Sequence, residues 1–183
     1  MTTQKQTRKR SRKSSPKQLN LGSGEYPLDG WESADIKGGE HTVDLSSFPW
    51  PFRASWYDEI MASHVLEHFT RDDGVRFLEE CKRILKKGAV LHLAVPDLDL
   101  FIGCKLSGDW SPVGGYHWKN IEWCMGGDEG ETDITMRHHY MYCWQSLART
   151  LEGLGFEVTR RDMGEHDNPR YELISLYVDA VKA

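Results

Sequence analysis

Short apolar runs separated by turn residues dominate the chain, and their spacing predicts an α/β fold. Seven of these runs have the length and composition of strands: residues 18–21, 32–36, 42–45, 59–63, 89–95, 156–162 and 172–181. Runs of this length between clusters of Gly, Pro, Asn, Asp and Ser are typical of strands. The run 59–63 alternates little, which indicates a strand buried on both faces.

Two segments carry apolar residues at the three- and four-residue spacing of a helix. In the first, Thr70 is an N-cap and Asp73 completes a capping box. Lys86 and Lys87 fill the expected last turn, and Gly88 stands where that helix should end. Its apolar positions are Val75, Phe77, Leu78, Cys81, Ile84 and Leu85. The second helix is expected over residues 142–154, with Gly155 after it.

The order of these elements predicts one Rossmann-like open sheet, mostly parallel, in a three-layer α/β/α arrangement. Residues 59–95 alternate strand, helix and strand, which makes a right-handed parallel crossover. The last two strands are separated by polar residues, so the sheet should end in an antiparallel C-terminal strand. Too few residues separate the first two strands for a full helix, and the first crossover is therefore shortened.

Regular periodicity disappears between Phe101 and Arg137, and a long irregular stretch inside a domain is usually functional. We therefore expect a lid-like insertion over about 101–140. Its aromatic residues and those just after it either line an acceptor pocket or form a small core of the insertion. They are Trp110, Tyr116, Trp118, Trp123, Tyr140, Tyr142 and Trp144.

Charge divides the chain into a basic tail and an acidic body. Residues 1–18 hold seven Lys or Arg and no acid, and the remaining residues carry 16 bases against 28 acids. The tail has too few apolar residues to offset its ordering entropy, so we expect it to be disordered. It is either a tether to nucleic acid or an acidic surface, or a solubilising extension. Residues 19–183 form the single domain, which is too acidic for general binding to nucleic acid.

Cysteines and apolar segments indicate the compartment. The four cysteines, at 81, 104, 124 and 143, are widely spaced and form no C-x-x-C pair, as in reduced cytosolic proteins. No apolar stretch resembles a signal peptide or a membrane span. We expect a cytoplasmic protein with no span.

Residues with binding chemistry lie where the predicted strands end: Gly22, Ser23, Gly24, Asp35, Asp44, His64 and Asp97. In open parallel sheets, ligands bind beyond the carboxyl ends of the strands. The glycines let the backbone approach a ligand closely, and Asp35 can accept two hydrogen bonds from a ribose. A dinucleotide site places this acid about 20 residues after the glycines, whereas here it ends the next strand. S-adenosylmethionine fits, because it has a ribose and no phosphate.

The stretch from Leu19 to Asp97 resembles a class I S-adenosylmethionine-dependent methyltransferase of the type-11 group. L-N-L-G-S-G resembles its first motif, V-D-L-S-S-F-P-W-P-F its adenine segment, and Y-D-E-I-M-A-S-H-V-L-E-H-F its fourth-strand motif. F-L-E-E-C-K-R-I-L-K-K-G-A-V-L-H-L-A-V-P-D resembles the following helix and strand. The family usually has an acid where this chain has Asn20.

The resemblance implies a cofactor, a reaction and a site. The cofactor is S-adenosylmethionine, and the reaction is methyl transfer. The residues implied to bind the cofactor are Asn20, Leu21, Gly22, Ser23, Gly24, Asp35, Ile36, Asp44, Leu45, Ser63, His64 and Leu66. Asp35 would bind the ribose, Asp44 would approach the adenine amino group, and Leu66 would pack under the cofactor.

The stretch S-H-V-L-E-H-F also contains H-x-x-E-H, the zinc signature of one class of peptidase. That hypothesis requires His64 and His68 on one face of a helix, with Glu67 as base. Residues 59–63, just before His64, have the pattern of a strand, and the helix signals begin only at Thr70. The two histidines should therefore not share a helix face, and we expect no metal site.

Methyl transfer is an in-line displacement, and a base is needed only where the acceptor must lose a proton. The catalytic candidates are His64, Asp97, His138 and His139. For the last two the alternative is a hydrogen bond to the lid, and for Asp97 it is a turn. We expect a small-molecule or glycan acceptor. The open alternatives are a nucleic-acid or protein methyltransferase recruited by the tail, and a non-catalytic relative that binds the cofactor or nothing.

Overall fold

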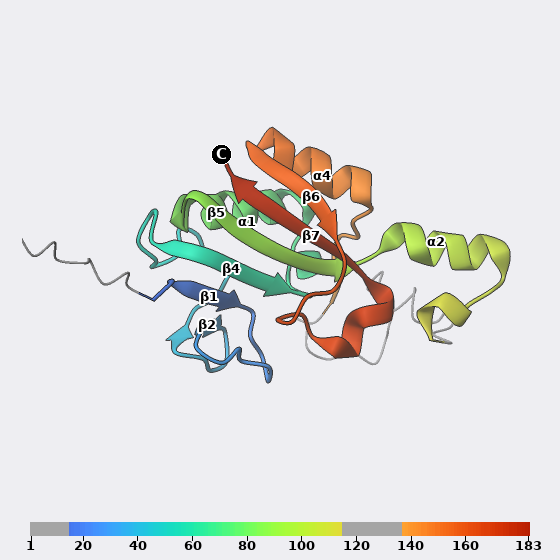
Figure 1. Ribbon diagram of the computed structural model, residues 1–183, viewed down its shortest axis with the longest axis horizontal. Helices are drawn as coiled ribbons and strands as arrows, with labels where there is room; N and C mark the ends of the chain where they lie inside the picture. Colours follow the sequence, from blue (N-terminus) through green and yellow to red (C-terminus); the bar gives the residue numbers. More distant parts are fainter. Residues whose placement is uncertain (1–14, 115–136) are drawn as a thin grey trace, which may run out of the picture.

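The computed structural model describes residues 15–114 and 137–183, which form one seven-stranded sheet in the order β3-β2-β1-β4-β5-β7-β6 (Figure 1). The strands are β1 (Gln18–Leu21), β2 (Glu32–Asp35), β3 (His41–Thr42), β4 (Tyr57–Ser63), β5 (Leu85–Pro96), β6 (Phe156–Arg161) and β7 (Ser175–Lys182). The first five strands pair with one another in parallel, and β7 is antiparallel to both β5 and β6. The predicted Rossmann-like sheet with an antiparallel strand is confirmed.

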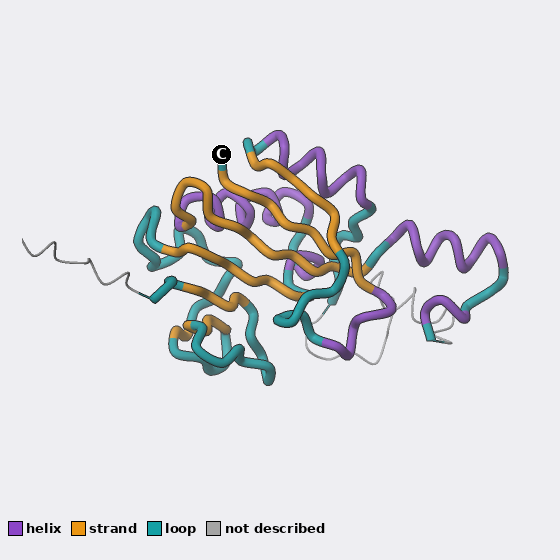
Figure 2. The backbone as a smooth tube through the Cα atoms, in the orientation of Figure 1, coloured by secondary structure: helices purple, strands orange, loops and turns teal. Residues whose placement is uncertain are grey.

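Helices of the described part occur only after β4 (Figure 2). The α-helices are α1 (Arg71–Ile84), α2 (Leu98–Ser107) and α4 (Trp144–Gly153), and the 3₁₀ helices are η1 (Leu66–His68), η2 (Ser111–Val113) and η4 (Pro169–Ile174). The connection from β1 to β2 contains turns and no helix. The shortened first crossover is therefore confirmed.

One face of the sheet carries the main hydrophobic core. Alternate residues of the strands point to this face: Leu19, Leu21, Ile60, Ala62, Leu91, Leu93, Val95, Leu176, Val178 and Ala180. They pack against Phe77, Leu78, Cys81 and Ile84 of α1 and against Leu147 and Leu151 of α4. The two helices lie side by side, since the Lys82 ammonium donates to the carbonyl of Leu154. Burial of these side chains is the main driving force for folding.

The other face of the sheet is more polar and is covered by loops. Hydrogen bonds cross it from Gln18 to Glu59 (2.9 Å) and from His92 to Asp179 (2.7 Å). The edge of the Trp31 ring contacts His166, with 5.2 Å between the ring centroids, so the β1–β2 loop meets the β6–β7 loop there.

The beginning of α1 agrees with its predicted cap, and its end does not. The Thr70 hydroxyl accepts from the Asp73 amide (3.2 Å) and donates to the Asp73 carboxylate (2.9 Å). The prediction that the helix runs to Gly88 was wrong, because Leu85 already pairs with Tyr57 as the first residue of β5. Gly88, at φ +76°, lies instead where the register of the two strands shifts.

The prediction of an irregular segment starting at Phe101 was also wrong in its first part. Residues 98–107 form α2, which the Asp97 carboxylate caps by accepting from the Asp99 amide (3.0 Å). Its apolar residues Phe101 and Cys104 pack in a small second cluster with Val113 and Met141. The sequence signal failed because α2 buries few residues and is apolar around its circumference, which removes the usual one-sided pattern.

Several expectations concern residues outside the described ranges. Residues 1–14 of the basic tail are among them, as are Tyr116, Trp118, Trp123 and Cys124. The described part of the expected tail is ordered, because Gln18 begins β1 and the amide of Lys17 donates to Asp58 (2.9 Å). No helix within residues 15–114 and 137–183 has the length and apolarity that crossing a membrane requires.

The cap of α1 gives a first test of how this helix is held. We expect Thr70→Ala to lower the free energy of unfolding by about 1 kcal/mol, because the Asp73 amide loses its acceptor. Thr70→Ser keeps the hydroxyl and serves as the matched control, with most of the stability retained. Urea denaturation followed by circular dichroism measures both. Equal stability of Thr70→Ala and the wild type would contradict the capping role.

Candidate functional site

The turn after β1 lies at the carboxyl edge of the sheet and is built from Gly22, Ser23 and Gly24. The Gly22 amide donates to the Ala34 carbonyl at the end of β2 (2.8 Å). Gly22 has φ +64° and Gly24 has φ +48°, conformations that favour glycine. The glycines therefore allow the chain to turn sharply while its backbone stays tied to β2.

Gly22 also permits a close approach between this turn and the loop after β4. A Cβ atom placed on Gly22 would lie 2.4 Å from a Val65 methyl carbon, which is far inside van der Waals contact. A Cβ on Gly24, in contrast, would meet no atom within 4 Å. One glycine is thus required for packing within the protein, and the other leaves open space beside the turn.

Asp35 ends β2 beside that open space. Its Oδ2 accepts from the Gly24 amide (2.9 Å) and its Oδ1 from the Lys37 amide (3.0 Å). These bonds fix the carboxylate at the mouth of the turn, and each oxygen keeps a further lone pair. The next residue, Ile36, is a large apolar side chain with 47% of its surface exposed. The pair offers hydrogen-bond acceptors for a ribose and an apolar surface for an adenine ring.

Asp44 is more strongly engaged within its own loop. It accepts from the Ser46 amide and hydroxyl (2.9 and 2.6 Å) and from the Ser47 hydroxyl (2.9 Å). These hydrogen bonds, those from Ser46 first, lower the pKa of its carboxyl below the ordinary value. Leu45 is buried in the core. Asp44 therefore shapes the turn after β3, and its side chain is available to a ligand through its remaining lone pairs only.

Three more of the residues expected at the cofactor are buried parts of the framework. Asn20 is 5% exposed, and its amide nitrogen donates to the Tyr26 carbonyl (3.2 Å). Leu21 and Leu66 are fully buried. Asn20 thus tethers the glycine turn from within, where the family pattern has an acid.

The end of β4 brings a second set of side chains to the same edge. Ser63 ends the strand, and His64 follows it in the left-handed region, with φ +54°. Its amide donates to the Ala94 carbonyl of β5 (2.8 Å), which holds this backbone in place. The imidazole stacks on the Tyr171 ring, with 4.0 Å between centroids. The unusual backbone conformation turns the side chain toward η4.

His64 connects a buried carboxylate to a hydroxyl group. Its Nδ1 lies 3.1 Å from Glu67 Oε1, and its Nε2 lies 2.7 Å from the Ser175 hydroxyl. Glu67 is fully buried in the turn after β4. Burial raises the pKa of Glu67, but hydrogen bonding to His64 and the charges of three histidines outweigh it, so the pKa lies below the ordinary value.

The other catalytic candidates lie in different surroundings. Asp97 is almost fully buried, caps α2 and pairs with Arg160 (3.0 Å). His138 is buried, with its Nε2 3.9 Å from Glu67 Oε1. The His139 side chain is exposed, and its amide donates to the Glu67 carbonyl (2.8 Å). The structure brings His64 and His138 together around Glu67 and gives Asp97 a capping role.

The helix required by the H-x-x-E-H hypothesis is absent from this described stretch. η1 covers only Leu66–His68, and His64 has a backbone conformation that no right-handed helix contains. His64 and His68 therefore do not form the one-turn-apart pair of a zinc peptidase helix.

Sequence reasoning missed Ser175 and Tyr171, and it considered Glu67 only as a peptidase base. Ser175 donates to the Tyr171 carbonyl (2.8 Å) while contacting His64. Both residues lie more than 100 positions from His64; Ser175 falls within the strand expected over residues 172–181, and Tyr171 comes just before it. One sequence signal was available. Glu67 directly follows two apolar residues, Val65 and Leu66, and lies between His64 and His68, a position that suits a buried carboxylate.

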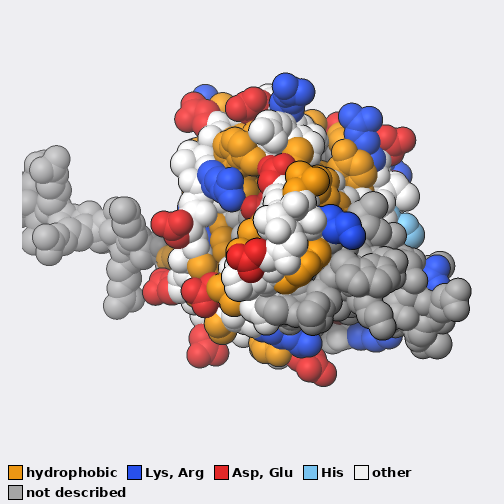
Figure 3. All heavy atoms as spheres, turned by 90° about the vertical axis from the view of Figure 1, so that its right-hand side faces the viewer, with side chains coloured by type: hydrophobic (Ala, Val, Ile, Leu, Met, Phe, Trp, Pro, Cys, Tyr) orange, Lys and Arg blue, Asp and Glu red, His pale blue; other side chains and the backbone are white. Residues whose placement is uncertain are grey.

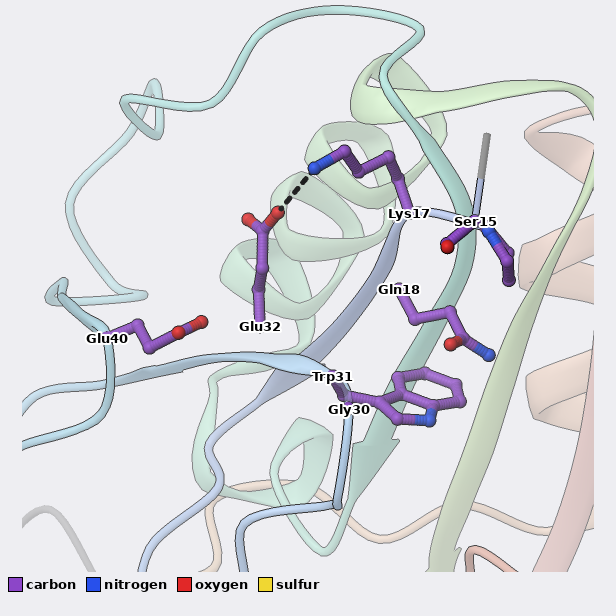
Figure 4. Close-up of a pocket in the computed structure, with 8 residues that line it drawn as sticks. Ser15, Lys17, Gln18, Gly30, Trp31, Glu32 and Glu40 are labelled. Atoms are coloured by element: carbon purple, nitrogen blue, oxygen red, sulfur yellow. Dashed lines mark ion pairs between the residues drawn. The ribbon is translucent and has the colours of Figure 1, made fainter. Parts of the chain in front are cut away.

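A hollow of about 530 Å³ lies at the opposite edge of the sheet, at the amino ends of β1 and β2 (Figure 4). Its lining includes Trp31, Glu40 and the ion pair between Lys17 and Glu32 (3.6 Å). None of the residues expected to bind a cofactor lines it. Ligands of parallel sheets bind at the carboxyl edge, and we therefore do not assign the cofactor to this hollow.

Comparison with known proteins agrees with this geometry. Residues 15–93 match the family model of a methyltransferase domain, and this match covers β1 to β5 almost completely. A search of curated proteins finds no match to the chain.

Solved structures share the fold at low sequence identity. The CurJ carbon methyltransferase superposes with a TM-score of 0.59 at 18% identity over 92% of this chain and 49% of that one. This chain thus spans about half of that protein. A methyltransferase of Archaeoglobus fulgidus gives 0.58 at 15% identity over 91% and 86% of the two chains. A methyltransferase of Thermotoga maritima superposes with a TM-score of 0.58 at 15% identity, over 93% of this chain and 84% of that one.

The mostly parallel sheet, with the glycine turn and Asp35 at its carboxyl edge, has the fold of class I methyltransferases. Residues 15–93 are thus similar to a methyltransferase domain, and the chain shares its fold with S-adenosylmethionine-dependent methyltransferases.

The carboxylate of Asp35 gives a direct test of the cofactor site. We expect Asp35→Ala to weaken S-adenosylmethionine binding tenfold or more, because a charge-assisted hydrogen bond exceeds the 1.4 kcal/mol of one decade. Isothermal titration calorimetry measures the change. Asp162→Ala is the matched control, since Asp162 is also exposed and follows a strand, β6. Unchanged affinity of Asp35→Ala would remove Asp35 from the site.

Proposed function

We propose that this chain transfers a methyl group to a hydroxyl group of a small molecule or glycan. The observation that carries the proposal is the His64–Glu67 pair at the carboxyl edge, where Val65 packs against the cofactor turn. A buried carboxylate beside a partly buried imidazole is an arrangement suited to accepting a proton. Hydroxyl acceptors have to lose a proton during methyl transfer, and such a pair meets that need.

The residues proposed to hold the cofactor follow from the open space beside the turn. Gly24 and Asp35 would take the ribose, and the exposed Ile36 would pack on the adenine. The backbone of Gly22 and Ser23 would face the methionine end. S-adenosylmethionine, when bound, supplies an electrophilic methyl group, which is transferred by in-line displacement.

The proposed path of the proton runs from the acceptor through Ser175 to His64. The negative charge of Glu67 favours the hydrogen of neutral His64 on Nδ1, 3.1 Å away, which leaves a lone pair on Nε2. The Ser175 hydroxyl donates its one hydrogen to the Tyr171 carbonyl, and in the proposed path it turns this hydrogen toward Nε2 when it accepts from a bound acceptor. An acceptor hydroxyl bound at Ser175 can pass its proton along this line. Stacking on Tyr171 fixes the plane of the imidazole, and the charge that His64 gains is balanced by Glu67.

The surface at this edge favours a neutral acceptor over a polynucleotide. Viewed from the side to which the arrows of β1 and β4 point, acidic, basic and apolar side chains are interspersed (Figure 3). Residues 19–183 carry 28 acids against 16 bases. Binding along a phosphate backbone depends on clustered Lys and Arg, which this part of the chain does not supply.

An acceptor screen tests the proposal. The full chain is incubated with methyl-labelled S-adenosylmethionine and, separately, hydroxylated small molecules, oligosaccharides, transfer RNA, duplex DNA and a protein mixture. We expect label in the small-molecule or oligosaccharide fraction. A chain lacking residues 1–14, which keeps β1 intact, should label equally well. Label that enters only RNA, DNA or protein and falls on truncation would instead establish a methyltransferase recruited by the tail.

The proton path has its own test in His64→Gln. With the acceptor found by the screen, we expect kcat to fall by about 100-fold or more, because proton removal loses its base. The dissociation constant of S-adenosylmethionine should stay within about threefold of the wild type. His41→Gln is the matched control, since His41 also pairs with a glutamate, Glu32, at 3.1 Å. Unchanged kcat in His64→Gln would exclude His64 as the base.

A further inference from the structure

Two more histidines, His68 and His138, lie close to the buried carboxylate of Glu67. The ligand atoms of Glu67, His68 and His138 all lie within 4.8 Å of one another. His138 Nε2 lies 3.9 Å from Glu67 Oε1, and the rings of His68 and His138 meet edge to face at 4.8 Å. Two imidazoles and a carboxylate therefore converge on one point.

The burial of Glu67 indicates that a ligand is needed at this point. The residue is 0% exposed, and neither oxygen of its carboxylate accepts a hydrogen bond of normal geometry from the described residues, although Oε1 lies 3.1 Å from His64 Nδ1. A buried carboxylate oxygen without a donor costs free energy that a protein usually recovers from a partner or a metal ion. A cation held between Glu67 and the two histidines would supply that partner.

The tautomer of His68 is set for metal binding. Its Nδ1 lies 3.1 Å from the Arg137 carbonyl, which can only accept a hydrogen bond, so Nδ1 carries the hydrogen. In the neutral ring, Nε2 then keeps a lone pair. A backbone carbonyl on the second ring nitrogen is the common support of a metal-binding histidine.

The backbone holds the three side chains together from two distant parts of the chain. Glu67 and His68 lie in η1, and the Glu67 carbonyl accepts from the amides of His139 (2.8 Å) and Tyr140 (3.2 Å). This pairing places His138 opposite η1. Tetrahedral ligands about 2.1 Å from a metal ion lie about 3.4 Å apart, so ligand atoms up to 4.8 Å apart would move closer by about 1 Å when the ion binds.

We propose that Glu67, His68 and His138 form a binding site for a divalent first-row transition-metal ion of the zinc type. Two histidines and one carboxylate suit such ions better than magnesium or calcium, which prefer oxygen ligands. Three protein ligands leave positions open for water or a substrate oxygen. The site differs from the peptidase signature considered above, because His138 stands in place of His64.

The proposed metal site meets the candidate catalytic pair at Glu67, which His64 and the ion would share. A cation bound to Glu67 would fix the carboxylate that faces His64, and this role rests on the proposed function.

Zinc titration into the metal-stripped full chain tests the site. We expect binding of one Zn²⁺ per chain by isothermal titration calorimetry and a higher melting temperature with the metal. His68→Ala and Glu67→Gln should each weaken the binding at least tenfold, because each removes one ligand. The first changes a partly exposed residue, and the second keeps the size of the buried side chain.

His166→Ala is the matched control, since His166 is a partly exposed histidine 3.3 Å from a glutamate, Glu165. It should bind Zn²⁺ as the wild type does. No stoichiometric binding, or equal binding by His68→Ala and the wild type, would overturn the proposal, as would loss of binding in His166→Ala. Denaturation of each variant with a chelator present separates lost ligands from lost folding.

S-adenosylmethionine titrations keep the two proposals apart. Zn²⁺ binding without cofactor binding would support the metal site and refute the proposed transfer reaction. Cofactor binding without Zn²⁺ binding would refute the metal site alone. Mg²⁺ that displaces Zn²⁺ at equal concentration would overturn the assigned class of metal.

Discussion

The close packing of Gly22 against Val65 is the constraint on which the candidate site depends. It joins the turn after β1 to the loop after β4 with no room for a side chain on Gly22. The same turn is tied to β2 through the Ala34 carbonyl and the Asp35 carboxylate. Three strand ends are therefore held in one rigid unit, with the Asp35 carboxylate at one end and His64 beside the other.

The buried carboxylate of Glu67 is the second organising element. Its side chain lies among three histidines, and its carbonyl accepts two amides from the segment before α4. A charge in the interior is costly unless it is compensated. The positions of His64 and His138 therefore both depend on Glu67. A displacement of one histidine is expected to shift the other.

Much of the fold follows from local patterns, whereas the site follows only in part. The strand runs and the Thr70 cap were readable because each depends on neighbouring residues. The end of α1 could not be predicted in this way, because Leu85 pairs with Tyr57 of β4, which is distant in sequence. The Gly22, Asp35 and His64 positions follow from the parallel sheet. Contacts of His64 with Ser175 and Tyr171 depend on tertiary packing that no local pattern encodes.

The direct passage from α1 into β5 restricts how this part of the molecule can adjust. Ile84 ends the helix and Leu85 begins the strand, so no linker separates them. The register between β4 and β5 shifts after Leu85, where Gly88 adopts φ +76°. This bulge is the part of the connection whose length can change. Insertions or deletions at this bulge can be absorbed as a longer or shorter protrusion. The same change within either regular element would slide side chains out of their rows and move the strand end that carries Asp97.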